Sequence, residues 1–586
     1  MVNIKIDGVA VQVEEGTTIL EAARQNGIRI PTLCYLKELN EIGACRICVV
    51  EIKGGRSLFA ACVYPISKMD EGREIFTHSK AVIESRRTTL QLLLSTHNQN
   101  CLSCDRSGTC EFQALCKDLG VTDSYKYLGE IRDQTYDTSS CSVVRDNSKC
   151  INCRRCVAAC SVNQSVGVIG ANNRGFKTEI GCAFDMDLAQ SACVSCGQCI
   201  AVCPTGALTE KDDTDKVWAA LADPTKTVVV QAAPSVRASL GEAFGFPIGT
   251  PVEGKLATSL RMLGFNAVFD TNFGADLTIM EEATELLDRV TNGGVLPMVT
   301  SCSPGWIRFA EAYYPDLLPH LSSCKSPQQM QGAVIKTYWA NKTGVDPKNI
   351  VSVSVMPCTA KKFEIGRLDQ SAAGKDLPDL DISITTRELA KMIHKAGIRF
   401  ADLNDSVFDS PMGNGTGAAV IFGATGGVME AALRTAVWKL TGQSPDSPVQ
   451  FTEVRGVDGV KFAEYKVGDL TVKVAVASGL ANARKLLDKV RAKELDVQFI
   501  EIMACPGGCV NGGGQVIQPA DVRNFTDLRA ERAKALYSLD SANKLRKSHD
   551  NPEVLQAYSE FLGGAPGSHK AHEILHTTYR PSKVIK

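Results

Sequence analysis

The chain has 586 residues, of which 44% are hydrophobic and 22% charged, and its net charge at pH 7 is -1. Single hydrophobic cores rarely exceed about 250–300 residues, so a chain of this length is expected to contain several domains. The nearly neutral charge and ordinary composition give no reason to expect nucleic acid or an anionic membrane as a partner.

Cysteine is the residue type with an unusual distribution. The chain has 23 cysteines, and all but five lie at or before Cys203. Disulfide scaffolds are typical of short secreted chains, whereas tightly spaced CxxC pairs favour metal clusters in a reducing compartment. The N-terminus has no signal-peptide pattern, and no run of about 18 apolar residues occurs. The sequence therefore predicts a cytoplasmic iron–sulfur protein without a membrane span.

Residues 1–78 are predicted to form a β-grasp, ferredoxin-like domain. MVNIKIDGVAVQVEEG alternates like a pair of strands, TTILEAARQNGI is typical of an amphipathic helix, and VVEI and SLFAAC predict further strands. Four cysteines lie among these elements: Cys34, Cys45, Cys48 and Cys62. Four thiolates can hold a [2Fe–2S] cluster, and a structural zinc site is the alternative.

Residues 79–140 are predicted to hold a [4Fe–4S] cluster with one histidine ligand. The helix SRRTTLQLLLSTH is followed by H-x3-C-x2-C-x5-C, formed by His97, Cys101, Cys104 and Cys110. A histidine here is more often a helix-end residue, but His97 lies within reach of the three cysteines. An imidazole ligand makes the cluster less negative, which should raise its reduction potential. Cys116 and Cys141 fit no pattern and are predicted to be core residues.

Residues 141–209 contain the most specific motif, because C-x2-C-x2-C-x3-C occurs twice. The two runs are Cys150, Cys153, Cys156, Cys160 and Cys193, Cys196, Cys199, Cys203. In two-cluster ferredoxins the fourth cysteine of each run binds the other cluster, so Cys203 is assigned to the first [4Fe–4S] cluster and Cys160 to the second. Cys182 is left over. The front half thus predicts one [2Fe–2S] and three [4Fe–4S] clusters acting as an electron wire.

Residues 210–520 alternate apolar strands with amphipathic helices, which predicts an α/β domain with mostly parallel sheets. The predicted strands are TVVVQAAP, NAVFD, VLPMVTSC, VSVSVMPC, AAVIFGA, LTVKVAVASG and VQFIEIMAC. Three of them run into cysteine segments: Thr300–Trp306 (TSCSPGW), Met356–Glu364 (MPCTAKKFE) and Glu501–Gly514 (EIMACPGGCVNGGG). Carboxyl ends of strands gather the active sites of such folds, so the three segments are expected to meet.

Residues 521–586 read as a charged, helical tail that ends in HEILHTTYRPSKVIK. Its histidines could be ligands in principle, but surface or packing roles are the more ordinary expectation.

Together the three cysteine segments resemble the signature segments of the [FeFe]-hydrogenase catalytic domain, in the family's usual order. The preceding modules resemble those of its large multi-cluster members, and the tail resembles the small subunit that is separate in some members. The resemblance implies an active site between two lobes that holds the H-cluster, a [4Fe–4S] cubane bridged to a two-iron unit with CO, cyanide and azadithiolate. It also implies Cys358, Cys505 and Cys509 as cubane ligands, with Cys509 bridging.

The first segment departs from the family pattern TSCCPGW, in which the second cysteine is a cubane ligand and the first relays protons. Here Cys302 matches the relay and Ser303 stands at the ligand position. Three outcomes are open: Cys302 shifts to become the ligand, the serine oxygen binds iron, or the cubane is incomplete. Thiolate is the better iron–sulfur ligand, so the sequence favours Cys302 as ligand. Two alternatives are then open for Cys324: it helps to carry protons, or it is a core residue.

Other residues match the family more closely. Pro234 and Ser235, after Ala233, resemble the loop that faces one cyanide, and Lys361 resembles the cation paired with the other. Met356, Met503 and Gln328 resemble the lining of the site. Glu282 and Glu285 share one helix face by their spacing. With Ser322 and Arg289 they match the family's proton channel, although acids on a helix are by themselves more often a solvated face.

The resemblance implies an oxidoreductase that catalyses 2H⁺ + 2e⁻ ⇌ H2. The substrates are H2 and protons, and electrons would pass to ferredoxin, or to NAD(P) through flavin-containing iron–sulfur partner subunits, because no GxGxxG follows a strand in this chain. One alternative is a non-catalytic electron-transfer subunit like the large iron–sulfur subunit of complex I. Another is a degenerate hydrogen sensor or iron–sulfur assembly relative, which Ser303 keeps open.

Overall fold

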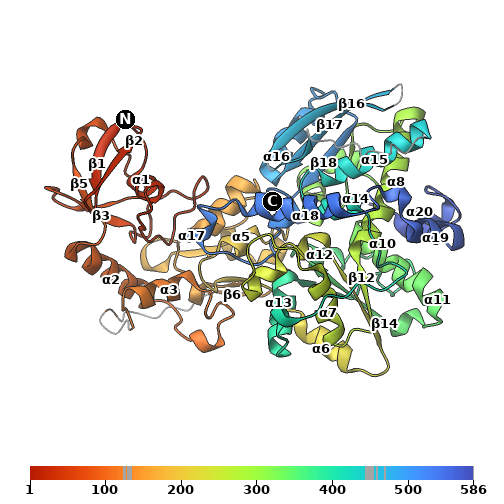
Figure 1. Ribbon diagram of the computed structural model, residues 1–586, viewed down its shortest axis with the longest axis horizontal. Coiled ribbons are helices and arrows are strands. Elements are labelled where there is room, and N and C mark those ends of the chain that lie inside the picture. Colours follow the sequence, from red (N-terminus) through yellow and green to blue (C-terminus); the bar gives the residue numbers. More distant parts are fainter. Residues whose placement is uncertain (123–126, 128–134, 443–453, 457–458, 468–469, 585–586) are drawn as a thin grey trace.

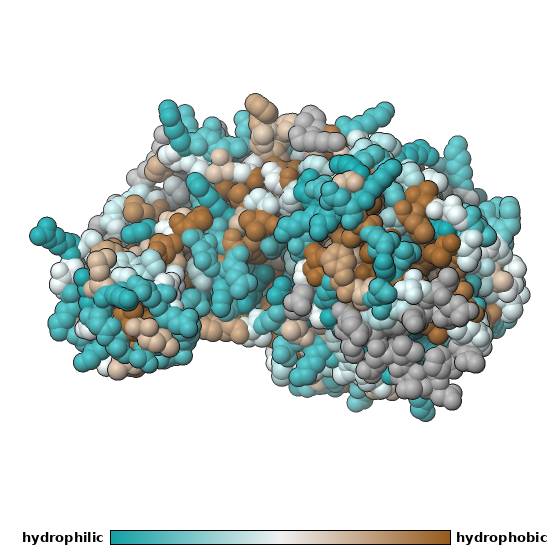
Figure 2. All heavy atoms as spheres, turned by 90° about the horizontal axis from the view of Figure 1, so that it is seen from above, coloured by the Kyte–Doolittle hydropathy of each residue, from teal (hydrophilic) through white to brown (hydrophobic). Residues whose placement is uncertain are grey.

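The computed structural model describes residues 1–122, 127, 135–442, 454–456, 459–467 and 470–584. The N-terminal modules form one end of an elongated molecule and a larger α/β body forms the other (Figure 1). Seen from above, hydrophilic side chains cover most of the visible surface at both ends (Figure 2). No helix among the described residues is both long and apolar enough to cross a membrane.

The N-terminal end is a five-stranded sheet in the order β2-β1-β5-β3-β4, with β1 and β5 parallel and the other pairs antiparallel. Its elements are β1 (Val2–Ile6), β2 (Val9–Val13), α1 (Ile19–Gln25), β3 (Val49–Ile52), β4 (Leu58–Ala60) and β5 (Glu74–Phe76). Residues of β1 alternate between buried and exposed, as a half-buried strand requires. The predicted hairpin, helix and strands of this region are confirmed.

The next modules consist largely of loops that carry cysteines, with short helices and strands between them. Their elements are α2 (Lys80–Leu94), α3 (Glu111–Asp118), β6 (Tyr136–Asp137), β7 (Val143–Asp146), α4 (Arg155–Ala158), β8 (Gly170–Asn172), β9 (Glu179–Gly181), α5 (Gln198–Val202) and β10 (Leu208–Glu210). Strands β10, β7 and β6 form an antiparallel sheet. The amide of Asn40 joins the first module to the third, since it donates to the carbonyls of Cys34 (2.7 Å) and Cys153 (3.1 Å).

The larger body contains two four-stranded sheets, seen in its lower and upper halves in Figure 1. The first has the order β12-β11-β14-β15 and is entirely parallel. The second has the order β13-β18-β17-β16, with only the β16–β17 pair antiparallel. The strands are β11 (Thr227–Ala232), β12 (Ala267–Asp270), β13 (Met298–Val299), β14 (Ile350–Met356), β15 (Ile382–Thr385), β16 (Val460–Val467), β17 (Leu470–Ser478) and β18 (Phe499–Met503). The predicted α/β class with mostly parallel sheets is confirmed.

Helices pack on both sheets and between them. They are α6 (Thr214–Ala222), α7 (Glu253–Met262), α8 (Thr271–Asn292), α9 (Pro304–Tyr313), α10 (Pro327–Val334), α11 (Ala340–Thr343), α12 (Lys361–Glu364), α13 (Thr386–Lys395), α14 (Gly417–Val420), α15 (Gly427–Thr441) and α16 (Leu480–Arg491). Separate apolar cores lie around β11 and β14 and around β17 and β18. Each of the three cysteine segments directly follows a strand, as predicted: β13, β14 or β18.

Two local predictions were wrong. AAVIFGA, predicted as a strand, begins in α14, which Thr416 caps, and continues as a short 3-10 helix. A short apolar run that is buried on all sides has no period that distinguishes a strand from a helix. Cys141, predicted to be core, is exposed, and its thiol contacts only the neighbouring Ser142 hydroxyl at 3.4 Å among the described groups. Cys116 and Cys182 are buried.

The C-terminal segment is helical, as predicted, and lies against the larger body. Its helices are α17 (Ala520–Arg523), α18 (Leu528–Ala542), α19 (Pro552–Glu560) and α20 (His569–Leu575). A buried ion-pair network joins α18 to α15: Arg434 donates to both carboxylate oxygens of Asp540 (3.0 and 2.9 Å) and to Glu430 (2.6 Å). Arg455 and Arg546 lie at the edge of the same network.

We predict that Arg434→Leu lowers the free energy of unfolding by about 3 kcal/mol, because it leaves two buried carboxylates with only the peripheral arginines as partners. Thermal unfolding followed by circular dichroism measures the loss. The matched control is Lys473→Met, which removes an exposed pair with Asp496 and should cost less than about 1 kcal/mol. Equal losses in the two variants would contradict the assigned role of the network.

Candidate active site

The four N-terminal cysteines come together at one end of the five-stranded sheet. Cys48 Sγ and Cys62 Sγ are 3.3 Å apart, and the Cys45 amide donates to Cys34 Sγ at 3.5 Å. Three of these side chains are buried and that of Cys45 is half-buried. The side chains that come together are thiols, and four thiols suit a [2Fe–2S] cluster.

His97 follows α2 and precedes the second group of cysteines in the chain. Its ring packs edge-on against Phe112 at 5.1 Å between centroids. Burial lowers the pKa of His97 to about 4, so the imidazole is neutral at pH 7. Its Nδ1 is buried and has no hydrogen-bond partner among the described residues, which suits a ring nitrogen that binds metal. Cys101 opens a short 3-10 helix whose C-cap is Cys104, and Cys110 caps α3.

The eight cysteines of the repeated motif divide between two small cavities as the crossing rule predicts. One cavity, of about 20 Å³, is lined by Cys150, Cys153, Cys156 and Cys203. The other, of about 30 Å³, is lined by Cys160, Cys193, Cys196 and Cys199. Each cavity thus gathers three thiols of one run and the last thiol of the other run. Two such sets of four thiols fit two [4Fe–4S] clusters.

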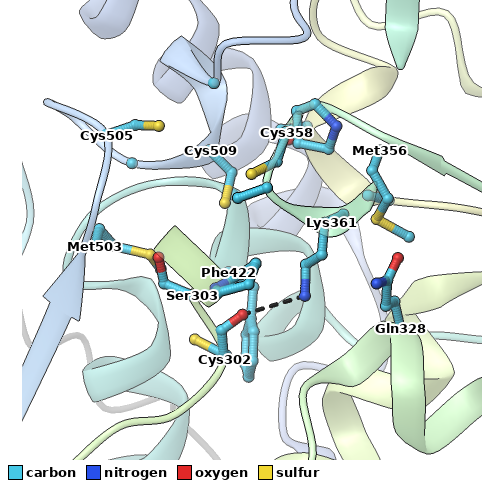
Figure 3. A pocket seen from close by; sticks show the side chains of 18 of the residues that line it. Cys302, Ser303, Gln328, Met356, Cys358, Lys361, Phe422, Met503, Cys505 and Cys509 are labelled. Carbon is cyan, nitrogen blue, oxygen red and sulfur yellow. Dashed lines mark hydrogen bonds between the residues drawn. The ribbon is translucent and has the colours of Figure 1, made fainter. Parts of the chain in front are cut away.

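A larger cavity, of about 80 Å³, lies where the carboxyl ends of both sheets of the larger body meet. The first sheet contributes Ala233, Pro234 and Ser235 after β11, and Met356, Cys358 and Lys361 at the end of β14 and beyond. The second sheet contributes Cys302 and Ser303 after β13, and Met503, Cys505 and Cys509 at the end of β18 and beyond. Gln328 of α10 and Cys196 of the ferredoxin motif complete this part of the lining. Figure 3 shows the labelled side chains around the cavity.

Cys302 and Ser303 point to different sides. The Ser303 hydroxyl lies on the side of Cys505 and Cys509, while the Cys302 sulfur points away from them (Figure 3). Ser303 Oγ accepts a hydrogen bond from the amide of Ala504 at 3.2 Å, next to Cys505. Burial raises the pKa of the Cys302 thiol, and the charge that acts on it most strongly is that of Glu282. The Ser303 hydroxyl thus lies on the side of the thiols, whereas the Cys302 thiol points away from them and feels the charge of Glu282.

Lys361 is the cation of the cavity. Its ammonium donates to the Cys302 carbonyl (3.2 Å), the Ser326 hydroxyl (2.9 Å) and the Glu364 carboxylate (2.9 Å). Gln328 donates to the same carboxylate oxygen at 2.7 Å. A buried ammonium that is held by three acceptors presents a fixed positive charge to whatever occupies the cavity.

The lining also contains a buried polar atom, Ser235 Oγ, without a hydrogen-bond partner in the described part of the chain, which suits a polar ligand. Ser235 Oγ is fully buried and has no hydrogen-bond partner among the described residues, although it is a donor. Met356 and Met503 are both 2% exposed and supply apolar contact on either side. Three thiols, one free hydroxyl donor, one lysine and apolar walls match the needs of an iron–sulfur centre with small polar ligands.

The acidic side chains of α8 lie in a row that leads away from the cavity. Glu282 is fully buried, and burial together with the charge of Glu285 raises its pKa to about 8. Both of its carboxylate oxygens lack a partner at hydrogen-bonding distance among the described residues. The nearby Ser322 hydroxyl and Ser301 amide lower the pKa of Glu282, but by less than burial raises it. Ser322 donates to Glu285 at 2.8 Å, and Glu285 pairs with Arg289 at 2.6 Å. The row thus leads from the buried Glu282 to the half-buried ion pair of Glu285 and Arg289.

Sequence reasoning missed two buried acids at this site. Glu364 lies in the quoted segment MPCTAKKFE, three residues after Lys361 on α12, and that helical spacing could have identified the pair. Glu501 accepts the amides of Gly426 (2.6 Å) and Met429 (2.7 Å), and burial raises its pKa to about 7. No local pattern pointed to that role, because both donors lie on a distant helix.

The loop of the second ferredoxin cavity packs directly on the large cavity. Cys196 lines both cavities. Thr359 donates to the carbonyl of Ser195 at 2.7 Å, and Gln198 donates to the carbonyl of Asn511 at 2.8 Å. A Cβ atom on Gly513 would overlap the Cys196 carbonyl and Gly197, so two backbones meet here without side chains between them.

Models of known families match nearly the whole chain. "Iron only hydrogenase large subunit, C-terminal domain" matches residues 226–513, and "Iron hydrogenase small subunit" matches residues 526–582. The front half matches "2Fe-2S iron-sulfur cluster binding domain" at residues 1–79, "NADH-ubiquinone oxidoreductase-G iron-sulfur binding region" at 86–124 and "4Fe-4S dicluster domain" at 149–207.

Two relatives align with this chain over almost the whole length of both chains. The chain is 49% identical to the NADP-reducing hydrogenase subunit HndD of Solidesulfovibrio fructosivorans, with 99% of each chain covered. It is 46% identical to iron hydrogenase 1 of Clostridium pasteurianum over 99% of this chain and 100% of that one. A solved structure of a variant of the [FeFe]-hydrogenase HydA1 from Chlamydomonas reinhardtii matches with a TM-score of 0.56 at 45% identity, over 63% of this chain and 98% of that one.

The raised pKa of Glu282 predicts a pH-dependent cost to stability. The unfolded chain releases the proton near pH 4.5 and the folded one near pH 8, so stability falls as the pH rises between these values. Glu282→Gln removes this term, and its unfolding temperature should fall less than that of the wild type between pH 5 and pH 8. Glu494→Gln, at an exposed position, is the control and should follow the wild type. Parallel curves for Glu282→Gln and the wild type would refute the prediction.

Proposed function

The chain belongs to the [FeFe]-hydrogenase family, and from this premise we propose which of its residues carry the reaction and how protons and electrons reach them. It is an iron hydrogenase, an oxidoreductase that catalyses 2H⁺ + 2e⁻ ⇌ H2, with [2Fe–2S] and [4Fe–4S] clusters and an H-cluster. A pure electron-transfer subunit is excluded, because the catalytic-domain match covers residues 226–513.

The observation that carries the site assignment is the convergence of Cys358, Cys505 and Cys509 on one buried cavity beside Lys361. The H-cluster, when bound there, supplies the iron centre at which H2 is formed or split. We assign these three thiols to its cubane, with Cys509 bridging to the two-iron unit. The cavity lies between the two sheets, which supports an active site between two lobes.

Ser303 is assigned as the fourth group at the cubane, and Cys302 as the proton relay. The support is geometric: the Ser303 hydroxyl faces the three thiols, whereas the Cys302 thiol faces Glu282. This assignment reverses the sequence-based preference for Cys302 as ligand. A serine oxygen is a harder ligand than a thiolate, so this corner of the cubane should be held less tightly.

The remaining cavity residues position the two-iron unit. The free donor on Ser235, next to Pro234, and the fixed charge on Lys361 suit the two cyanide ligands that the family carries. Met356 and Met503 exclude water, and Gln328 holds Glu364 in place beside Lys361. In a dry cavity these few polar contacts are stronger than they would be in water.

Protons are proposed to pass from the Cys302 thiol to Glu282, then through Ser322 to Glu285 and out beside Arg289. Cys302 lies in the loop after β13, Glu282 and Glu285 lie one turn apart on α8, and Ser322 lies in the loop before α10. A buried carboxyl with a pKa of about 8 can both hold and release a proton near neutral pH.

Electrons are proposed to travel through four clusters. The [2Fe–2S] domain spans 1–78, the domain with His97 spans 79–140, the two-cluster domain spans 141–209, the catalytic domain spans 210–520, and the small-subunit-like belt spans 521–586. The second [4Fe–4S] cluster, held by Cys193, Cys196, Cys199 and Cys160, lies next to the H-cluster, because Cys196 lines both cavities.

The protein is proposed to work in the cytoplasm with partner subunits that bind flavin and NAD(P), and to exchange electrons with ferredoxin. The name of the relative that is 49% identical, an NADP-reducing hydrogenase subunit, supports the NAD(P) link.

Infrared spectroscopy tests the site. Protein purified anaerobically after production with the family's maturation enzymes should show sharp CO and cyanide bands. Lys361→Asn should weaken these bands severalfold relative to the iron–sulfur signals, because the charge that holds the two-iron unit is lost. Lys342→Asn, a change at an exposed lysine, is the control. Full band intensity in Lys361→Asn would count against the role of Lys361, and a wild type without bands would count against the whole assignment.

The roles of Cys302 and Ser303 are separated by three variants. Ser303→Cys should retain cubane iron better than the wild type, and Ser303→Ala should retain it less well, as measured by iron content and electron paramagnetic resonance. Cys302→Ser should keep its iron but lower turnover by ~100-fold, because only the relay is damaged. The opposite pattern, in which Cys302→Ser loses iron and Ser303→Ala does not, would make Cys302 the ligand.

A further inference from the structure

The chain after α20 lies directly against the outer end of the proposed proton path. The amide of Thr577 donates to the carbonyl of Ser323, and the amide of Lys325 donates to the carbonyl of Leu575, each at 2.8 Å. These two bonds pair the C-terminal segment with the loop that carries Ser322, and they place His576 opposite Cys324. A residue more than 250 positions further along the chain thus becomes part of the surroundings of Glu285.

Both nitrogens of His576 are in contact with polar groups. Nδ1 lies 2.8 Å from Ser323 Oγ, and Nε2 lies 3.1 Å from Glu281 Oε2. The side chain is 6% exposed and that of Glu281 is 0% exposed. A ring that is engaged at both nitrogens is fixed in orientation, and a neutral imidazole can accept a proton at one nitrogen while it donates from the other.

His576 is also close to Glu285, the outer carboxylate of the path. A carboxylate oxygen of Glu285, the Cys324 sulfur and a ring nitrogen of His576 lie within 4.8 Å of one another. The Cys324 thiol contacts Glu285 at 3.7 Å, and the Ser323 amide donates to both oxygens of Glu285 (3.2 and 3.1 Å). No more than one small intermediary, Cys324 or a water molecule, is needed between the carboxyl and the ring.

The charged groups nearest to His576 are carboxylates of α8. Glu281 contacts the ring directly and Glu285 lies within 4.8 Å, whereas the cations Arg289 and Lys439 are directed at Glu285 and Thr284. Tyr558 donates to the other oxygen of Glu281 at 2.5 Å. His572, an exposed residue of α20, stacks on the ring at 4.0 Å between centroids and connects the site with solvent.

His549 shows how a packing histidine in the same segment differs. It stacks on Trp438 at 4.6 Å between centroids, and burial lowers its pKa to about 4, so it stays neutral at pH 7. Its ring Nδ1 lies near the Thr435 hydroxyl at 3.2 Å, whereas the His576 ring lies near two carboxylates of α8, those of Glu281 and Glu285.

We propose that His576 is a proton-carrying residue that gives the proton path a second branch, from Glu285 through the C-terminal segment to solvent. In H2 oxidation the O–H bond of the Glu285 carboxyl breaks and an N–H bond forms on the ring, after which a proton leaves to water beside His572. In H2 formation the same steps run in reverse, and no electrons move on this branch. The inference rests on the proposed path through Glu282 and Glu285.

The test compares His576→Gln with the wild type as mature holoenzyme, with iron content and infrared bands checked first. Turnover in a buffer without imidazole should fall by ~2-fold, because the exit beside Arg289 remains, and added imidazole should restore most of the loss, because a free base replaces the missing ring. His569→Gln, an exposed histidine at the start of the same helix, should behave as the wild type in both buffers. Unchanged turnover of His576→Gln, or a loss that imidazole does not restore, would overturn the proposal.

Two further variants keep the outcome decisive. If His576→Gln loses its infrared bands, Ser323→Ala decides, because it keeps the histidine but removes the group that orients Nδ1. Reduced turnover with intact bands supports the branch, and unchanged turnover refutes it. Glu282→Gln separates the two proposals, since unchanged turnover there would remove the main path itself, whereas a defect there with normal His576→Gln would remove only the branch.

Discussion

The meeting of two largely parallel sheets at one buried cavity is the constraint on which the rest of the structure depends. Each sheet delivers short segments from its carboxyl edge: Ala233 to Ser235 and Met356 to Lys361 from one, Cys302 to Ser303 and Met503 to Cys509 from the other. No single segment could surround a metal centre, and the three cysteine segments become one site only because both sheets point toward the same space. The ferredoxin modules and the C-terminal segment are arranged around that point.

The cavity also decides the electrostatics of its surroundings. Water is excluded by apolar residues, so charges there are either paired, as Lys361 is with Glu364, or shifted in pKa, as Glu282 is. The first kind of group holds a ligand in place, and the second kind can exchange a proton. The same low polarity therefore separates the residues proposed to position the cofactor from those proposed to carry protons.

Much of this arrangement follows from local sequence patterns, and the exceptions have physical causes. Cys150 and Cys203 could be assigned to one cluster because, in the repeated ferredoxin motif, the fourth cysteine of each run binds the other cluster. Strands β14 and β18 could be predicted because their apolar runs end in cysteine segments. The helical structure of AAVIFGA could not be predicted, because a short segment that is buried on all sides has no hydrophobic periodicity to distinguish a helix from a strand. The contacts of His576 and Glu501 are made by chain segments far apart in sequence, so only the folded structure brings the partners together.

The absence of side chains between Gly513 and the Cys196–Gly197 backbone has a consequence for the speed of the enzyme. Electron tunnelling slows steeply as the distance between donor and acceptor grows, so on the proposed electron route this close contact of two backbones shortens the last step to the active site. Its width is set by van der Waals contact of main-chain atoms, which thermal motion of side chains cannot vary. The last transfer should consequently have a nearly fixed rate, and control of the electron supply should lie further upstream, at the exposed modules where partners can dock.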